Sequence, residues 1–306
     1  GKVADVEGYY ENAKINRVYV DRVHVKKAFA EYTAAYNADD PKIKLKIDHT
    51  YRVAALCERI AKAAGMCVYD VELAWLSGML HDVGRFEQIK RYNTFSDADS
   101  VDHAKFGADL LFKDGLISTF LNGMVKCTGY KPGALENRYS SDGVFLYDRL
   151  NKSDMEMLEL AIRCHNMYRI PQGLNRREQA FCNVLRDADK VDIFKVNIDT
   201  PLEEIYNTTT EELMKSDITD EVLEAFDEEH CILKAIRRTP ADTVIGHVSL
   251  AYELVYDESV RITVEQGYLA KLMHFHSDNE ETNRKMAMVR EKMDSYVKKR
   301  IGEKDA

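Results

Sequence analysis

The hydrophobic positions of the chain recur at spacings of three and four residues along most of its length, which is the pattern of amphipathic helices. The clearest examples lie in residues 20–35, 47–64, 71–80 and 176–196. Only 5 prolines and 15 glycines interrupt the 306 residues, and residues that favour helices are abundant. The sequence therefore predicts an all-α fold.

The helical pattern also predicts how the chain is organised. Residues 113–152 form its least regular part, because glycines and a proline punctuate short apolar pieces there. We interpret this stretch as an insertion or lid within a helical core at residues 41–200. A helical extension at 1–40 precedes this core, and helices at 201–306 are expected to pack on it as a C-terminal region.

The net charge and the cysteines limit which partners and which cellular compartment are expected for the protein. The formal net charge of −9 makes broad attraction to nucleic acid or to an anionic membrane unexpected. The alternating lysines Lys42, Lys44 and Lys46 are interpreted as a solvated helix face. No apolar run reaches the roughly 18 residues of a membrane-spanning helix, and no signal peptide is recognisable. The 6 cysteines form no Cys-x-x-Cys pair, so neither a zinc ribbon nor a disulfide framework is expected, and a cytoplasmic location is favoured.

Two residues that commonly ligate metals, His81 and Asp82, stand side by side directly after the apolar run of residues 71–80. Adjacent side chains within a helix do not share a face. Gly84 is expected to end this helix, and at a helix terminus both side chains can turn toward one centre. The pair therefore predicts a site at a helix end.

Four further residues of the same chemical types fall within helical patterns. His49 shares a face with apolar residues, so its imidazole is expected to point inward, although such a histidine more often completes a core than binds a metal. Asp187 lies on the apolar side of the 176–196 helix, where a carboxylate needs a partner or a metal to offset its desolvation. The other two are His103, near the start of a helix, and His165, near the end of one.

In their order along the chain, these six residues resemble the ligand set of the HD-domain superfamily of metal-dependent phosphohydrolases. The local sequences are similar too: His-x-x-Arg-Val-Ala at 49–54, Gly-x-Leu-His-Asp-x-Gly at 78–84 and Arg-Asp-Ala-Asp-Lys at 186–190. The resemblance covers roughly residues 45–196. It implies an HD-type helical bundle, to which the C-terminal helices would be an addition.

The resemblance implies a site for two divalent metal ions, because His103 and His165 are additional to the minimal single-metal set of the family. By this analogy one ion is held by His49, His81 and Asp187 and the other by His103 and His165, while Asp82 bridges both. Nitrogen and oxygen ligands without cysteine favour iron or manganese, with nickel, cobalt and zinc as alternatives.

The implied activity is hydrolysis of a phosphoester in a nucleotide or another small phosphorylated molecule, with a metal-bridging hydroxide as the nucleophile. Arg85 stands where many family members have lysine, and Lys190 follows Asp187 on nearly the same helical face. Both are candidates for binding phosphate beside the catalytic Asp82, and surface ion pairs are the alternative for each. His165 is followed by Asn166 and no Gly-Tyr-Pro segment, which makes a cyclic-dinucleotide substrate unexpected.

Two other functions remain open at this point. Mixed-valent di-iron oxygenases use the same six-ligand pattern, and oxygen consumption would distinguish them from hydrolases. An inactive metal- or nucleotide-binding HD module is the second alternative. The methionines and tyrosines of the last predicted helix, from about Asn279, are candidates for a core or for a subunit interface in a homo-oligomer.

Overall fold

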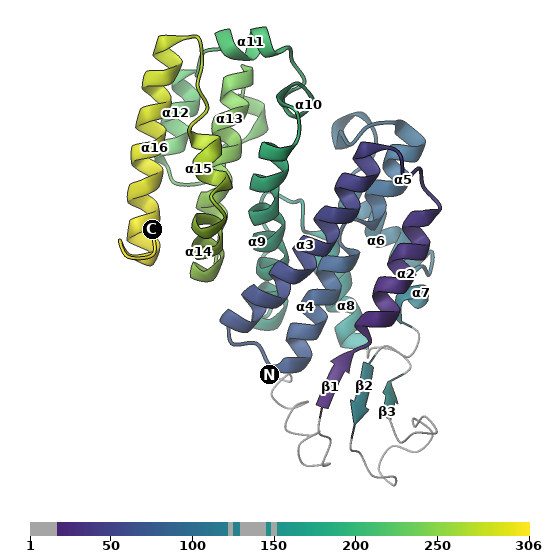
Figure 1. The fold of residues 1–306 in the computed structure, drawn as a ribbon. Helices are drawn as coiled ribbons and strands as arrows, with labels where there is room; N and C mark the ends of the chain where they lie inside the picture. Colours follow the sequence, from purple (N-terminus) through teal and green to yellow (C-terminus); the bar gives the residue numbers. More distant parts are fainter. Residues whose placement is uncertain (1–16, 122–124, 129–144, 148–151) are drawn as a thin grey trace. The chain divides into compact units, whose positions relative to one another are not determined.

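The structure is a computed structural model that describes residues 17–121, 125–128, 145–147 and 152–306. Helices make up most of the described chain (Figure 1). The chain divides into two compact units, Gly1–Ala188 and Asp189–Ala306. Among the described helices, none combines the length and the apolar character that crossing a bilayer requires.

The first unit contains the helices on which the predicted ligands lie. Its helices are α2 (Arg22–Ala34), α3 (Pro41–Ala63), α4 (Val68–Leu80), α5 (Val83–Tyr92), α6 (His103–Ala108), α7 (Ile117–Leu121), α8 (Lys152–Arg163) and most of α9 (Arg176–Asp199). A short 3₁₀ turn, Asp97–Asp99, precedes α6, and a π-helical turn, Asp109–Lys113, follows it.

Helix α3 ends close to where its sequence predicts, but it begins at Pro41, well before the predicted stretch of residues 47–64. The carboxylate of Asp40 accepts a hydrogen bond from the Lys42 amide at 2.9 Å, and Pro41 occupies the first turn. Beyond the helix, Gly65 has a φ of +77°, the left-handed conformation that favours glycine. Residues next to each end of the helix therefore determine where it begins and ends. With its start at Pro41, His49 lies two turns from the N-terminal end.

Helices α3 and α4 pack closely against each other. A Cβ atom on Gly78 of α4 would lie 2.6 Å from the Cα atom of Ala54 on α3, so only glycine permits this approach. The contact brings the end of α4, which carries His81, toward the middle of α3.

Gly84 does not end a helix, contrary to the prediction. Helix α4 ends at Leu80, and Gly84 lies in the first turn of α5, just after Asp82. A Cβ atom at this position would lie 2.7 Å from the Gly107 amide nitrogen and 2.7 Å from the His103 carbonyl oxygen. The glycine is required because α5 and α6 touch backbone to backbone, and this contact holds the start of α6 near Asp82.

A small three-stranded antiparallel sheet was not predicted. Its strands are β1 (Arg17–Val20), β2 (Val125–Thr128) and β3 (Phe145–Tyr147), in the order β1-β2-β3 (Figure 1). Val18 is paired with Cys127, and Lys126 with Leu146. The sheet is an addition to an otherwise helical fold, so the predicted all-α class is confirmed.

The expected insertion or lid at residues 113–152 falls largely on residues 122–124, 129–144 and 148–151, which lie outside the described residues. The same is true of residues 1–16 in the predicted N-terminal extension. Within the described part of that extension, β1 and α2 are present.

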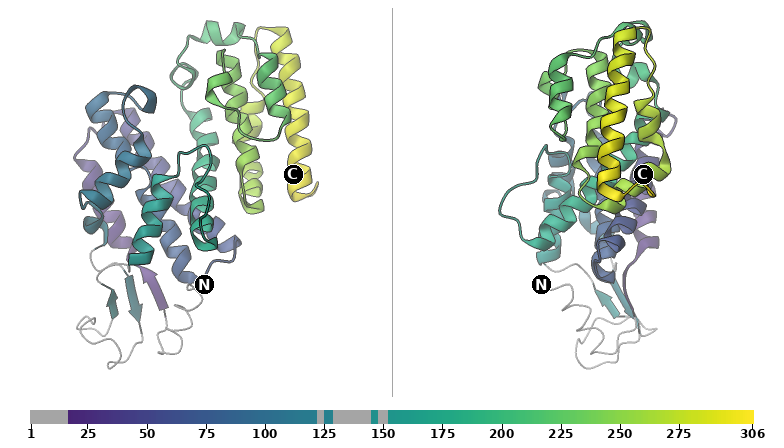
Figure 2. Two further views of the ribbon diagram at one scale, coloured as in Figure 1. Left: turned by 180° about the vertical axis from the view of Figure 1, so that it is seen from behind. Right: turned by 90° about the vertical axis from the view of Figure 1, so that its left-hand side faces the viewer.

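The second unit is built from helices and the connections between them, with no strand among its described residues. It contains α10 (Leu202–Tyr206), α11 (Thr210–Lys215), α12 (Asp220–Asp227), α13 (Pro240–Ser249), α14 (Asp257–Gln266), α15 (Tyr268–Met273) and α16 (Glu280–Ile301). The apolar side of α16 packs against α12, α14 and α15 (Figure 2). Met286, Val289 and Met293 on this side are 1%, 0% and 0% exposed, so they belong to the core of the unit.

The unfolding of the second unit is expected to depend on pH through His247 of α13. Burial, with Arg237 and Lys234 adding to it, lowers the pKa of this imidazole from 6.5 to about 3. The unfolded chain therefore takes up the proton more readily than the folded chain, and acid favours unfolding. Between pH 7 and pH 5 this linkage should remove roughly 2 kcal/mol from the free energy of unfolding.

Urea unfolding at the two pH values measures this effect. His247→Phe keeps an aromatic ring but cannot be protonated. Between pH 7 and pH 5, its free energy of unfolding should fall by about 2 kcal/mol less than that of the wild type. His276→Phe, at an exposed histidine of the same unit, should keep the wild-type pH dependence. An unchanged pH dependence in His247→Phe would contradict the prediction.

Candidate metal centre

Asp82 lies between two pairs of histidines. Its side chain is 3% exposed, and it stands between the end of α4 and the start of α5. One carboxylate oxygen, Oδ2, is 3.5 Å from the Nε2 atoms of both His49 and His81. The other, Oδ1, is 3.6 Å from Nε2 of His103 and 3.4 Å from Nε2 of His165. Four of the six predicted ligands thus surround the carboxylate of a fifth.

These side chains form two groups that share Asp82. The first contains His49, His81 and Asp82, and the second contains Asp82, His103 and His165. Within each group, the potential ligand atoms lie within 4.8 Å of one another. The ends of α4, α6 and α8 and one side of α3 contribute to this cluster. The Gly78 contact joins α4 to α3, and the Gly84 contact joins α5 to α6.

Three of the four imidazoles are oriented by a hydrogen bond at Nδ1. The acceptors, each at 2.6 Å, are the carbonyl oxygen of Gly78 for His81, the carbonyl oxygen of Ile162 for His165 and Oδ2 of Asp97 for His103. Because each acceptor requires a proton on Nδ1, the neutral rings keep a lone pair on Nε2. The lone pairs face Asp82 and one another.

The spacing of these lone pairs suits a bound cation. The Nε2 atoms of His103 and His165 are 3.0 Å apart, and those of His49 and His81 are 3.4 Å apart. Burial lowers the pKa of His103 to about 4, with Arg85 and His165 adding to the effect, so its ring is neutral at pH 7. Two neutral rings whose lone pairs face each other repel, and a metal ion that accepts both lone pairs relieves the repulsion.

Asp82 supplies the negative charge of the centre. Burial alone would raise the pKa of its carboxyl, but the Lys46 ammonium, with Nζ 3.3 Å from Oδ2, holds this pKa well below 3.8. The carboxylate is therefore ionised. Imidazole nitrogens around a carboxylate fit divalent iron, manganese, cobalt, nickel or zinc.

The sixth predicted ligand, Asp187, is 0% exposed on α9 and belongs to the first unit. Its burial agrees with its predicted place on the apolar side of that helix, and its role as a ligand stays a prediction. Lys190 lies on α9 in the second unit and is partly exposed. Its contact with a phosphate also stays a prediction.

The Arg85 guanidinium is held inside the first unit. Its Nη1 atom donates to the Gln88 side-chain oxygen at 2.8 Å, to the Phe95 carbonyl at 2.7 Å and to Oδ1 of Asp97 at 3.1 Å. The side chain is 15% exposed. These contacts favour the ion-pair alternative for Arg85, because a phosphate would have to compete with Asp97 for the guanidinium.

Sequence reasoning missed the position of Lys46. Its neighbours Lys42 and Lys44 are exposed, but the Lys46 side chain is only 14% exposed and its Nζ lies 5.3 Å from the centre of the Phe95 ring. The interpretation of all three lysines as a solvated face was therefore wrong for Lys46. A signal was present, because Lys46 precedes His49 by one helical turn and so shares its face.

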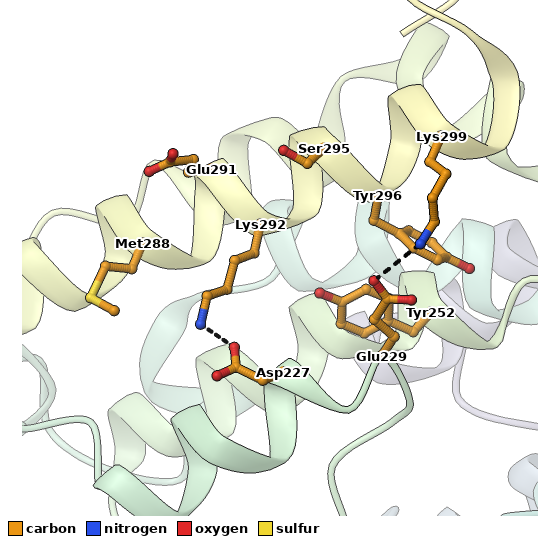
Figure 3. Close-up of a pocket in the computed structure, with 9 residues that line it drawn as sticks. All are labelled: Asp227, Glu229, Tyr252, Met288, Glu291, Lys292, Ser295, Tyr296 and Lys299. Atoms are coloured by element: carbon orange, nitrogen blue, oxygen red, sulfur yellow. Dashed lines mark hydrogen bonds and ion pairs between the residues drawn. The ribbon is translucent and has the colours of Figure 1, made fainter.

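A pocket in the second unit lies between α16 and the segment that contains α12 (Figure 3). Its charged groups are paired across the opening: Lys292 forms an ion pair with Asp227, and Lys299 lies 3.6 Å from Glu229. None of its described lining residues is a histidine or a cysteine. With its lysines already neutralised, this pocket offers no comparable site for a metal or a phosphate.

Comparison with known proteins identifies the family. A family model of the HD domain matches residues 47–300, which include all six predicted ligands. Among solved structures, that of a predicted HD superfamily hydrolase from an uncultured Thermotogales bacterium is 22% identical over 57% of this chain and 74% of its own, with a TM-score of 0.35. No curated protein matches the chain.

The predicted resemblance is confirmed, and it extends further than expected. Roughly residues 45–196 carry recognisable motifs, whereas the family match continues to residue 300 and so includes most of the second unit. The chain belongs to the HD-domain family.

Proposed function

We propose that this chain is a metal-dependent phosphohydrolase that cleaves a phosphoester bond of a nucleotide or another small phosphorylated molecule. The observation that supports this most is the buried Asp82 carboxylate, whose two oxygens each face a pair of imidazole Nε2 atoms. Such a donor set is suited to two divalent ions, with iron or manganese favoured.

In this proposal each ion has its own ligands. One would be held by His49, His81 and Asp187, the other by His103 and His165, and Asp82 would contact both. When bound, such ions lower the pKa of water and offset the negative charge of a phosphate group.

The protein's own residues prepare this centre. Hydrogen bonds at Nδ1 orient His81, His103 and His165 so that their lone pairs face inward. Lys46 lies beside Asp82, and its ammonium helps to keep that carboxylate ionised. Lys190 is a further candidate for contact with that phosphate.

Metal analysis of protein purified without chelator tests the number of ions. We expect two ions per chain, and we expect His103→Ala or His165→Ala to lower the number to one, because either change removes half of the imidazole ligands of the second group. His276→Ala, at an exposed histidine of the second unit, should keep both ions. A single ion that neither change affects would contradict the two-ion assignment.

A screen of phosphoesters and nucleotides with added manganese or iron tests the reaction. Phosphate release is expected with and without oxygen in the buffer. Oxygen consumption with a mixed-valent di-iron signal and no phosphate release would instead indicate the oxygenase alternative. Metal binding without either reaction would indicate an inactive binding module.

A further inference from the structure

The carboxylate of Asp97 connects a metal-facing histidine to α5. Its Oδ2 atom accepts a hydrogen bond from Nδ1 of His103 at 2.6 Å and from the His103 amide at 3.3 Å. Its Oδ1 atom accepts from Nη1 of Arg85 at 3.1 Å and from Nε2 of Gln88 at 2.9 Å. Asp97 thus has donors on both sides, and one of them is a predicted metal ligand.

The position of His103 explains why it needs a side-chain acceptor. His81 and His165 lie just after the C-terminal ends of α4 and α8, and each donates to a carbonyl three residues earlier, near a helix end where carbonyls face the following turn. His103 is the first residue of α6, and a helix N-terminus presents free N–H groups instead of carbonyls. The acceptor must therefore come from elsewhere, and Asp97 provides it.

We propose that Asp97 is a positioning residue for the metal group formed by Asp82, His103 and His165. It holds the proton of His103 on Nδ1, so that the lone pair on Nε2 points at Asp82. A carboxylate acceptor also makes the imidazole a stronger donor to a metal than a carbonyl does. This inference rests on the proposed function, in which His103 is a ligand of the second ion.

The surroundings of Asp97 hold it in place. Gln88 is 0% exposed, and its amide also donates to Oγ of Ser100 at 3.0 Å and to the carbonyl of Val101 at 3.3 Å. The Arg85 guanidinium lies 5.5 Å from the centre of the Phe95 ring. The segment that carries Asp97 is therefore anchored to α5, the helix that begins just after Asp82.

Asp97→Asn tests the proposal with little change of volume. The side-chain amide of asparagine has one acceptor atom and one donor atom. It therefore cannot accept hydrogen bonds both from His103 on one side and from Arg85 and Gln88 on the other. We expect the affinity for the second ion to fall by about 10- to 100-fold, with the first ion retained. Titration of the metal-free protein with manganese, followed by metal analysis, measures this without any assay of activity.

Asp102→Asn is the matched control. Asp102 caps α6 through the amides of Ala104 at 3.1 Å and Lys105 at 3.2 Å, and it accepts from Asn166 at 2.9 Å. Asparagine caps a helix as well as aspartate does, so this variant should bind both ions with wild-type affinity. Two ions bound with wild-type affinity by Asp97→Asn would overturn the proposal.

The tautomer of His103 gives a second measurement, independent of metals. In the metal-free wild-type protein, the ¹⁵N chemical shifts of the His103 ring should show the proton on Nδ1. In metal-free Asp97→Asn, they should show that a fraction of the molecules carries the proton on Nε2. If neither protein binds a second ion but the tautomer shifts, the proposed function fails while the positioning role of Asp97 stands. An unchanged tautomer would overturn that role.

Arg85→Gln provides a further variant in case Asp97→Asn does not fold. It removes the guanidinium charge that pairs with Oδ1 of Asp97, and it leaves the hydrogen bond from His103 to Asp97 in place. We expect weaker binding of the second ion, by less than about tenfold. A rise in KM for the phosphoester with wild-type affinity for both ions would instead assign Arg85 to the substrate and contradict its support of Asp97.

Discussion

Replacing Asp82 with alanine is expected to remove both metal ions and to lower phosphate release by at least about 100-fold. Residues that only support a metal ligand typically contribute 10- to 100-fold, and Asp82 faces all four imidazoles of the cluster. Metal analysis and a phosphate-release assay on the same preparation measure the two effects together. Full activity in Asp82→Ala would contradict the proposed mechanism.

Two controls separate the role of Asp82 from general damage. Asp99→Ala removes an exposed carboxylate from the same unit and should leave metal content and activity unchanged. Asp82→Asn keeps the shape of the side chain and loses its charge. It should fold and should still lose most of its activity, because a neutral amide cannot offset the charge of two cations.

Replacing Gly84 with alanine is expected to lower the free energy of unfolding by about 3 kcal/mol, because overpacking of this kind acts on backbone atoms that cannot rotate away. The added methyl group would lie 2.7 Å from atoms of both Gly107 and His103. Pushing α6 away from α5 would also withdraw His103 from Asp82, so the second ion should be lost. Urea unfolding and metal analysis measure the two effects.

Gly65→Ala is the matched control for this change. Gly65 has a φ of +77° and open space where a Cβ atom would be, so alanine there should cost only about 1 kcal/mol through backbone strain. Both ions should remain bound. If Gly84→Ala were no less stable than Gly65→Ala, the close contact of α5 and α6 would not restrict the residue at position 84, and the prediction would be wrong.

The helices and the order of the candidate ligands could be predicted because both depend on local patterns. Apolar spacing locates most of α3 and α9, and the predicted inward face of His49 agrees with its 1% exposure. The sheet could not be predicted in this way. Strands of three and four residues are too short to show an alternating pattern, and the pairing of β1 with β2 joins residues more than 100 positions apart.

The supporting residues of the site were harder to predict than its ligands. A glycine after an apolar run fits both a helix end and a close helix contact, and only the distance from Gly84 to Gly107 distinguishes the two. Asp97 precedes His103 by six residues in a segment without periodicity, so no pattern connects them. Lys46 shared a visible pattern with two exposed lysines, and its helical spacing from His49 was the better guide.

The backbone contact between Gly84 and Gly107 restricts how this sequence can evolve. A side chain larger than hydrogen at Gly84 would force α5 and α6 apart and withdraw His103 from Asp82, whereas a Cβ atom on Gly107 would lie 3.0 Å from the Gly84 amide nitrogen and would need a smaller shift. Gly84, although it binds nothing itself, is therefore expected to be under the same selection as the histidine, and Gly107 under a weaker form of it. A lineage that abandoned the second ion would be released from that selection and could accumulate larger residues at both positions.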